Sequence, residues 1–177
     1  MINRILGVTL VGVGLLAGTG ALTQAQEPAT VSPDSQFIIK AAQGGIAEVE
    51  LGNVAKDHAK NSDVKDFGQK MVDDHSKAND ELKALAMQKN VTLPNEVDPK
   101  AKAVMSKLSG LSGDAFDRAY VKDMVADHKE DIAEFRKEAN NGKDPDVKAW
   151  ASKTLPTLEN HLGMIQNVQH KLTMNAR

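Results

Sequence analysis

Four long stretches of helical periodicity, separated by a short, a long and a short connection, constrain the fold of this chain more than any other feature. The stretches cover residues 34–60, 62–89, 113–140 and 145–172. In each of them, apolar residues recur at alternating intervals of three and four, the spacing of a single buried face on an α-helix. Each helix would be roughly 40 Å long at 1.5 Å per residue. The pattern therefore predicts an all-α protein.

The ends of these stretches carry helix-capping signals. Ser32-Pro33-Asp34 combines a hydroxyl N-cap, a proline in the first turn and an acidic residue. Asn61 and Asp144-Pro145 open two further stretches, and Gly142 closes the third. Because so few residues separate the first two stretches and the last two, each pair should form an antiparallel hairpin. Gly44-Gly45, inside the first stretch, predicts a close approach between helices.

The connection over residues 91–112 is too long to join neighbouring helix ends. It contains Pro94, Pro99 and Gly110 and has little periodicity, apart from a short helix predicted over residues 100–108. A segment of this length suits a crossover along the whole bundle, as in ferritin-like folds. The prediction is a ferritin-like four-helix bundle with one long crossover between the second and third long helices.

The composition agrees with this fold and excludes several functions. Only 3% of the 177 residues are aromatic, whereas sandwiches and barrels need many aromatic and β-branched strand residues. A net charge of −2 argues against a nucleic-acid-binding protein, whose surface would be basic. No Gly-rich phosphate loop, nucleophile elbow or Cys–His pair is present. We therefore assign no catalytic residue and expect a binding protein rather than an enzyme.

The N-terminus has the build of a secretory signal peptide. Arg4 precedes an apolar run, and Thr23-Gln24-Ala25 offers a small-residue cleavage site. We expect residues 1–25 to be the signal peptide, residues 26–35 a flexible leader and residues 36–177 the bundle. No later apolar run approaches the roughly 20 residues of a membrane helix, so we expect a periplasmic or secreted protein without a membrane span after cleavage. An uncleaved N-terminal anchor is the alternative.

One ionisable residue interrupts each apolar stripe near the middle of its helix. These residues are Glu48, His75, His128 and His161. With the predicted bounds, each lies within roughly 4 Å of its helix centre along the axis. The four should therefore converge at one level inside the bundle. A charge buried there requires a metal ion, an ion pair or a hydrogen-bond network.

Two of these histidines belong to an internal repeat. The pattern of an aromatic residue, three residues, then Met-Val-x-Asp-His ends at His75 and again at His128, with a constant offset of 53 residues. The similarity suggests that the bundle consists of two related helix pairs. A repeated Asp-His is less easily explained by chance than a lone histidine.

The chain resembles a family of exported bacterial proteins, domain of unknown function 4142, within the ferritin-like superfamily. The motifs that carry the resemblance are AAQGG at 41–45, EVELG at 48–52, the two MVxDH repeats, and LPxLxxHL at 155–162. They span nearly all of the predicted mature chain. The resemblance implies a fold and a location in the cell envelope, and it implies no established activity.

The sequence departs from ferritin-like di-iron enzymes at the positions that matter for iron. Those enzymes take a Glu from two helices and a Glu-x-x-His pair from each of the other two. Here the residues three before the histidines are Val72, Val125 and Leu158. A carboxylate-rich di-iron site is therefore not expected.

Two interpretations of the four polar residues remain open. In the first, Glu48, His75, His128 and His161 bind one Zn, Cu or Fe ion, and Asp74, Asp127 or Asp131 orients the imidazoles. Met71 and Met124 could add soft ligands, although ordinary core packing explains them as well. In the second, the residues form a metal-free polar core of a non-catalytic envelope protein that acts in stress or interaction. The sequence does not indicate an oligomeric state.

Overall fold

The computed structural model describes residues 31–175, which form five helices and contain no strand. The helices, in chain order, are α1 (Pro33–His58), α2 (Ser62–Gln88), α3 (Pro99–Ser109), α4 (Gly113–Asn141) and α5 (Pro145–Met174). The all-α prediction is confirmed. The predicted signal peptide and leader residues 26–30 lie outside the described residues. None of the described helices is both long and apolar enough to cross a membrane.

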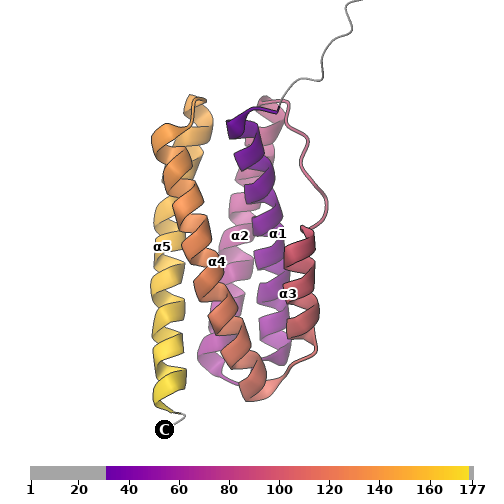
Figure 1. Cartoon of the computed structure of the whole chain (residues 1–177), viewed down its shortest axis with the longest axis vertical. Coiled ribbons are helices and arrows are strands. Elements are labelled where there is room, and N and C mark those ends of the chain that lie inside the picture. Colours follow the sequence, from indigo (N-terminus) through magenta and orange to yellow (C-terminus); the bar gives the residue numbers. More distant parts are fainter. Residues whose placement is uncertain (1–30, 176–177) are drawn as a thin grey trace, which may run out of the picture. The chain divides into compact units, whose positions relative to one another are not determined.

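The four long helices lie side by side as two antiparallel hairpins, α1 with α2 and α4 with α5 (Figure 1). The hairpins meet where α2 packs against α5 and α1 against α4. The chain after α2 returns along the bundle through α3, so α2 and α4 run in the same direction (Figure 1). The predicted crossover and the short helix within it are therefore present, and α3 packs against α1 and α4 as a fifth helix.

The repeated MVxDH motif does not relate one hairpin to the other. It lies on α2 and α4, which are the second helix of one hairpin and the first helix of the other. These two helices occupy opposite corners of the bundle, because each packs mainly on α1 and α5. The repeat therefore places two histidines across from each other, and the predicted pairing of duplicated hairpins is not what the packing shows.

Helix starts follow the capping signals in the sequence. Ser32 accepts a hydrogen bond from the Ser35 amide at 3.0 Å, and Asn61 accepts one from the Asp63 amide at 2.8 Å. Asp144 accepts hydrogen bonds from the amides of Asp146 and Val147, in the first turn of α5. These bonds satisfy backbone donors that lack a partner in the first helical turn.

Two buried aspartates tie each hairpin to the turn of the other. Asp34 on α1 accepts from the amides of Lys143 at 3.0 Å and Asp144 at 2.8 Å, in the α4–α5 turn. Asp117 on α4 accepts from Lys60 at 3.1 Å and Asn61 at 2.9 Å, in the α1–α2 turn. Because hydrogen bonds to a charged acceptor are among the stronger ones, these contacts fix how the two hairpins are aligned along the bundle.

The closest approach of α1 and α2 involves glycines other than the predicted pair. A Cβ on Gly52 would lie 2.6 Å from the Gly68 carbonyl oxygen, and a Cβ on Gly68 would lie 2.8 Å from that of Gly52. The prediction of a close approach at Gly44-Gly45 is thus only partly correct. Gly45 makes room for the side chain of Asn79, whereas a Cβ on Gly44 would meet nothing within 4 Å.

The apolar core consists of two clusters. One, toward the α1–α2 turn, includes Leu51, Phe67, Met71, Tyr120 and Ile165. The other, toward the α4–α5 turn, includes Phe37, Leu82, Phe135, Trp150 and Leu158. Between them, at mid-height, lie the buried polar side chains Glu48, His75, His128 and His161. The fold therefore positions a polar layer between two apolar ones.

A buried carboxyl pair at one end of the bundle predicts a pH-dependent stability. Burial, followed by the charge of Asp34 and a hydrogen bond to it, raises the pKa of Glu138 from 4.5 to about 6. The folded chain thus holds this proton more tightly than the unfolded chain. The stabilisation is full below pH 4.5 and is lost as the pH rises through about 6.

Glu138→Gln should therefore be more stable than the wild type at about pH 8, by about 1 kcal/mol, and equally stable at about pH 4. Urea unfolding at both pH values measures the difference, and exposed Glu50→Gln is the control. A gain that is the same at both pH values would show that folding does not raise the pKa of Glu138.

Candidate metal centre

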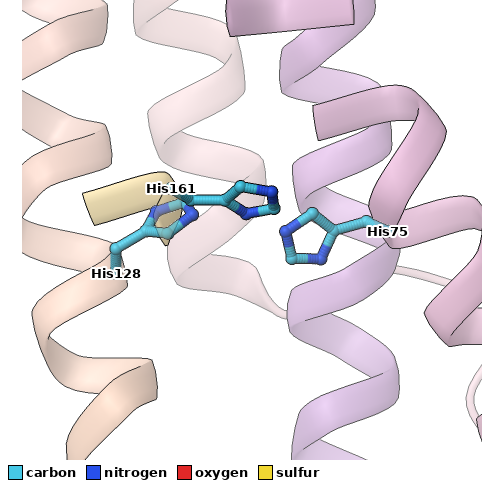
Figure 2. Close-up of side chains that lie close together, drawn as sticks. All are labelled: His75, His128 and His161. Carbon is cyan, nitrogen blue, oxygen red and sulfur yellow. The ribbon is translucent and has the colours of Figure 1, made fainter. Parts of the chain in front are cut away.

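The four ionisable residues of the apolar stripes are all buried in one layer of the bundle. Glu48 is 1% exposed, His75 7%, and His128 and His161 0%. Each comes from a different long helix. Figure 2 shows the rings of the three histidines directed toward one another from their helices. Their ring centroids are 5.5 to 6.1 Å apart. The convergence predicted from the helix centres is thus what the structure shows.

Glu48 links two of the histidines. Its Oε2 atom lies 2.7 Å from Nε2 of His75, and its Oε1 atom lies 3.5 Å from Nδ1 of His128. Neither carboxylate oxygen has a well-aligned hydrogen bond, in spite of the short contact with His75. One ligand atom from each of the three histidines lies within 4.8 Å of the others. Nitrogens bound tetrahedrally to one Zn ion would be roughly 3.4 Å apart, so small side-chain rotations would complete such a site.

The tautomers of two histidines follow from their neighbours. Nδ1 of His128 lies 3.1 Å from the carbonyl oxygen of Met124, which can only accept, so this nitrogen carries the proton. Nε2 of His161 lies 2.7 Å from Oδ2 of Asp74 and donates to it. The second nitrogen of each ring then holds a lone pair. Metal-binding histidines commonly use a carbonyl or carboxylate in this way to fix the ring.

The nitrogens left over have no partner. Nε2 of His128 and Nδ1 of His161 are buried without a hydrogen bond or an ion-pair partner, whereas Nε2 of His75 and Glu48 form an ion pair with each other. A buried polar atom without a partner costs about 1–3 kcal/mol. Two such nitrogens in one layer are unusual for a structural core, and a neutral imidazole nitrogen is a common metal ligand.

The layer contains an ionised carboxylate. Burial alone would raise the pKa of Glu48, but the charges of His75 and His128 hold it below its usual range. Burial would likewise lower the pKa of His75, and the charge of Glu48 raises it instead. Burial, opposed by the hydrogen bond to Asp74, lowers the pKa of His161 to about 4. His161 is therefore neutral at pH 7 and free to act as a ligand.

Of the acidic residues expected to orient an imidazole, Asp74 contacts one and Asp127 does not. Burial, followed by its interaction with Glu48, raises the pKa of Asp127 to about 9, so this carboxyl group is protonated at pH 7 and orients no imidazole. Glu48, Asp127 and His128 also bring one ligand atom each within 4.8 Å of the others. Asp74, next to His75 in the sequence, bonds to His161 on another helix.

The surroundings of the layer differ on its two sides. Toward the α1–α2 turn, Phe67 lies 6.0 Å from the ring of His128 and 6.3 Å from that of His161. Met71 and Met124 are fully buried in the same apolar cluster, which agrees with a packing role. Toward the α4–α5 turn, the cavity beside His75 is lined by polar side chains, Asn79, Asp131 and Thr154, as well as by large apolar ones such as Phe135 and Trp150. His58, which lies outside the layer, contacts the Leu111 carbonyl oxygen at 2.8 Å.

The fold and this layer define a helical-bundle protein with a buried His/Glu cluster. A family model, domain of unknown function (DUF4142), matches residues 19–168, and the chain belongs to this family. The predicted family is thus confirmed. No curated protein matches the sequence.

Two solved structures have the same fold. A fragment of a DUF305 protein from Deinococcus radiodurans superposes with a TM-score of 0.70 at 14% identity, covering 80% of this chain and 98% of that one. A presumed secreted DUF305 protein from Streptomyces coelicolor superposes with a TM-score of 0.67 at 15% identity, covering 79% and 92%. At such low identity the likeness concerns the fold alone.

Replacing the buried carboxylate tests whether the layer is held together by charge. Glu48→Gln removes the anion that faces His75 and His128 while keeping the size of the side chain. Because breaking a buried ion pair leaves one charge uncompensated, we expect a loss of about 3–5 kcal/mol in the metal-free protein. Urea unfolding provides the measurement, and exposed Glu50→Gln, two residues away on the same helix, should change stability by less than about 0.5 kcal/mol. Equal effects of the two substitutions would contradict an ionic layer.

Proposed function

We propose that this chain is an exported protein that binds one divalent transition-metal ion through His75, His128, His161 and Glu48. The observation that carries the proposal is that one ring nitrogen from each of the three buried histidines lies within 4.8 Å of the others, while Nε2 of His128 and Nδ1 of His161 have no partner. The carbonyl of Met124 and the carboxylate of Asp74 hold two of the rings in the tautomer that a ligand needs. A network formed only for packing would not leave the remaining nitrogens unpaired.

The donor set favours some metals over others. Three imidazoles and one carboxylate suit Zn or Cu, and imidazole also accepts Fe. A di-iron site would need more carboxylates, since Val72, Val125 and Leu158 replace the glutamates of the Glu-x-x-His pairs. With the Glu48 carboxylate turned toward the three histidines, the four side chains would fill the positions of a tetrahedral ion, which supports holding a metal rather than activating a substrate.

Export is the second part of the proposal. The predicted signal peptide at residues 1–25 supports it. The fold is shared with a presumed secreted protein. In the periplasm or outside the cell, a single tightly held ion fits a role in protecting the envelope against metal or oxidative stress.

The alternative function is a metal-free stress or interaction protein whose polar layer only fixes the packing. One observation favours it, namely the 2.7 Å contact between His75 and Glu48, which already forms an ion pair without a metal. Buried ion pairs of this kind can specify one packing arrangement of a core. The two functions differ in whether His128 and His161 bind a metal ion through the ring nitrogens that have no partner.

Measurements of metal content and metal affinity distinguish the two functions. Protein purified without chelator should contain one equivalent of metal by elemental analysis, and the His75→Ala/His128→Ala double variant should contain none. His170→Ala, an exposed histidine on α5, is the matched control and should retain the metal. Asp74→Asn should weaken binding by about 10- to 100-fold in calorimetric titration, because it releases the ring of His161.

Thermal melting gives an independent readout. A ligand at 100 times its dissociation constant stabilises the folded state by about 2.7 kcal/mol, so added Zn, Cu or Fe should raise the melting temperature of the wild type and the His170→Ala variant only. A metal-free protein whose melting temperature ignores all three ions would favour the alternative function.

A further inference from the structure

An acidic cavity of about 350 Å³ lies between α1, α3 and α4, next to the polar layer. Six acidic side chains line it, of which Asp127 is protonated at pH 7: Asp98, Asp123, Asp127, Glu130, Asp131 and Glu134. Two lysines also line it, and each is paired with one of these acids, Lys40 with Glu134 at 3.1 Å and Lys100 with Glu130 at 2.9 Å. The lining therefore retains a negative balance that attracts cations.

A second, much smaller cavity lies against His75. Its volume of about 20 Å³ is enough for one water-sized particle, which needs roughly 10–15 Å³. Gly44 and Asp131 line both cavities. These two residues therefore form the boundary between the acidic cavity and the space next to a candidate ligand.

Gly44 keeps this boundary open. A Cβ at this position would meet no atom within 4 Å, so the helix surface facing the boundary is bare. Glycine in the middle of a helix is less favourable than alanine, and no close packing at Gly44 offsets this cost. The open space at the boundary therefore explains why a glycine, which has no side chain, occupies position 44.

The acidic cavity reaches the polar layer at a second point. Asp127 lines the cavity and also lies beside Glu48, whose buried carboxylate has no aligned hydrogen bond. On the opposite side of the layer, Phe67, Met71 and Tyr120 are 1% exposed or less. An ion approaching from that side would have to cross an apolar core.

We infer that the acidic cavity is the entrance through which a divalent cation reaches the histidines, with Gly44 and Asp131 at its inner end. The inference rests on the proposed metal binding and adds the route and the charge of the incoming species. Clefts lined by one sign of charge raise the association rate of an oppositely charged ligand by about 10- to 1,000-fold, and salt weakens this effect.

Stopped-flow uptake of Zn²⁺, with a chromophoric chelator as reporter, tests the inner end of the route. Gly44→Leu should slow uptake at least about 10-fold by filling the boundary, and the final stoichiometry should stay at one ion. Gly163→Leu is the matched control, since Gly163 is exposed on α5 and a Cβ there also meets nothing within 4 Å. Uptake by Gly44→Leu at the rate of the control would overturn the route.

Removing two acidic side chains from the lining of the acidic cavity tests whether its charge attracts the ion. Glu130→Gln/Glu134→Gln should slow Zn²⁺ uptake and reduce its dependence on salt, while the dissociation rate stays unchanged. Asp66→Asn/Asp73→Asn removes two exposed acids from α2 and should leave both rates as in the wild type. Equal effects of the two double variants would overturn the role of the cavity. A wild-type chain that takes up no metal would overturn the proposed function together with the entrance, whereas stoichiometric uptake at unaltered rates overturns the entrance alone.

Discussion

The rest of the structure depends on one constraint, a carboxylate that stays ionised in the middle of a helical bundle. Glu48 is 1% exposed, and its charge is tolerable only because His75 and His128 lie beside it at 2.7 and 3.5 Å. This requirement explains why the apolar core divides into two clusters and why the helices must meet in one register. A shift of one residue along any helix would rotate its polar side chain by about 100° away from the layer.

Hydrogen bonds at the two ends of the bundle, far from the polar layer, help to hold the helices in this register. Asp34 and Asp117 each bind the turn of the opposite hairpin, which sets the heights of α1 and α2 relative to α4 and α5. Gly52 and Gly68 bring α1 and α2 close enough for Glu48 to reach His75. The crossover then places α3 over the side of α1 and α4, where it completes the acidic cavity beside the layer.

The sequence predicted the helices and the four residues of the layer because both follow from periodicity. A stripe with one ionisable residue at mid-height predicts where that residue lies, whatever the loops do. Contacts between side chains and distant backbone do not follow from periodicity. The sequence therefore does not predict that Asp34 and Asp117 accept hydrogen bonds from the turn of the opposite hairpin. Nor does it predict that Asp74 bonds to His161 rather than to the adjacent His75. The acidic cavity could not be predicted either, because nothing in the sequence indicates that acids of the crossover and of α4 lie together until the position of α3 is known.

The most direct test of the account is X-ray absorption spectroscopy of the Zn-loaded wild-type protein at the zinc edge. The account predicts a four-coordinate ion with nitrogen and oxygen ligands at about 2.0–2.1 Å and the outer-shell scattering of three imidazoles. The spectrum of the His75→Ala/His128→Ala variant should lack this imidazole signal. A wild-type spectrum of oxygen ligands alone, without imidazole scattering, would contradict the claim that the buried layer is a metal site.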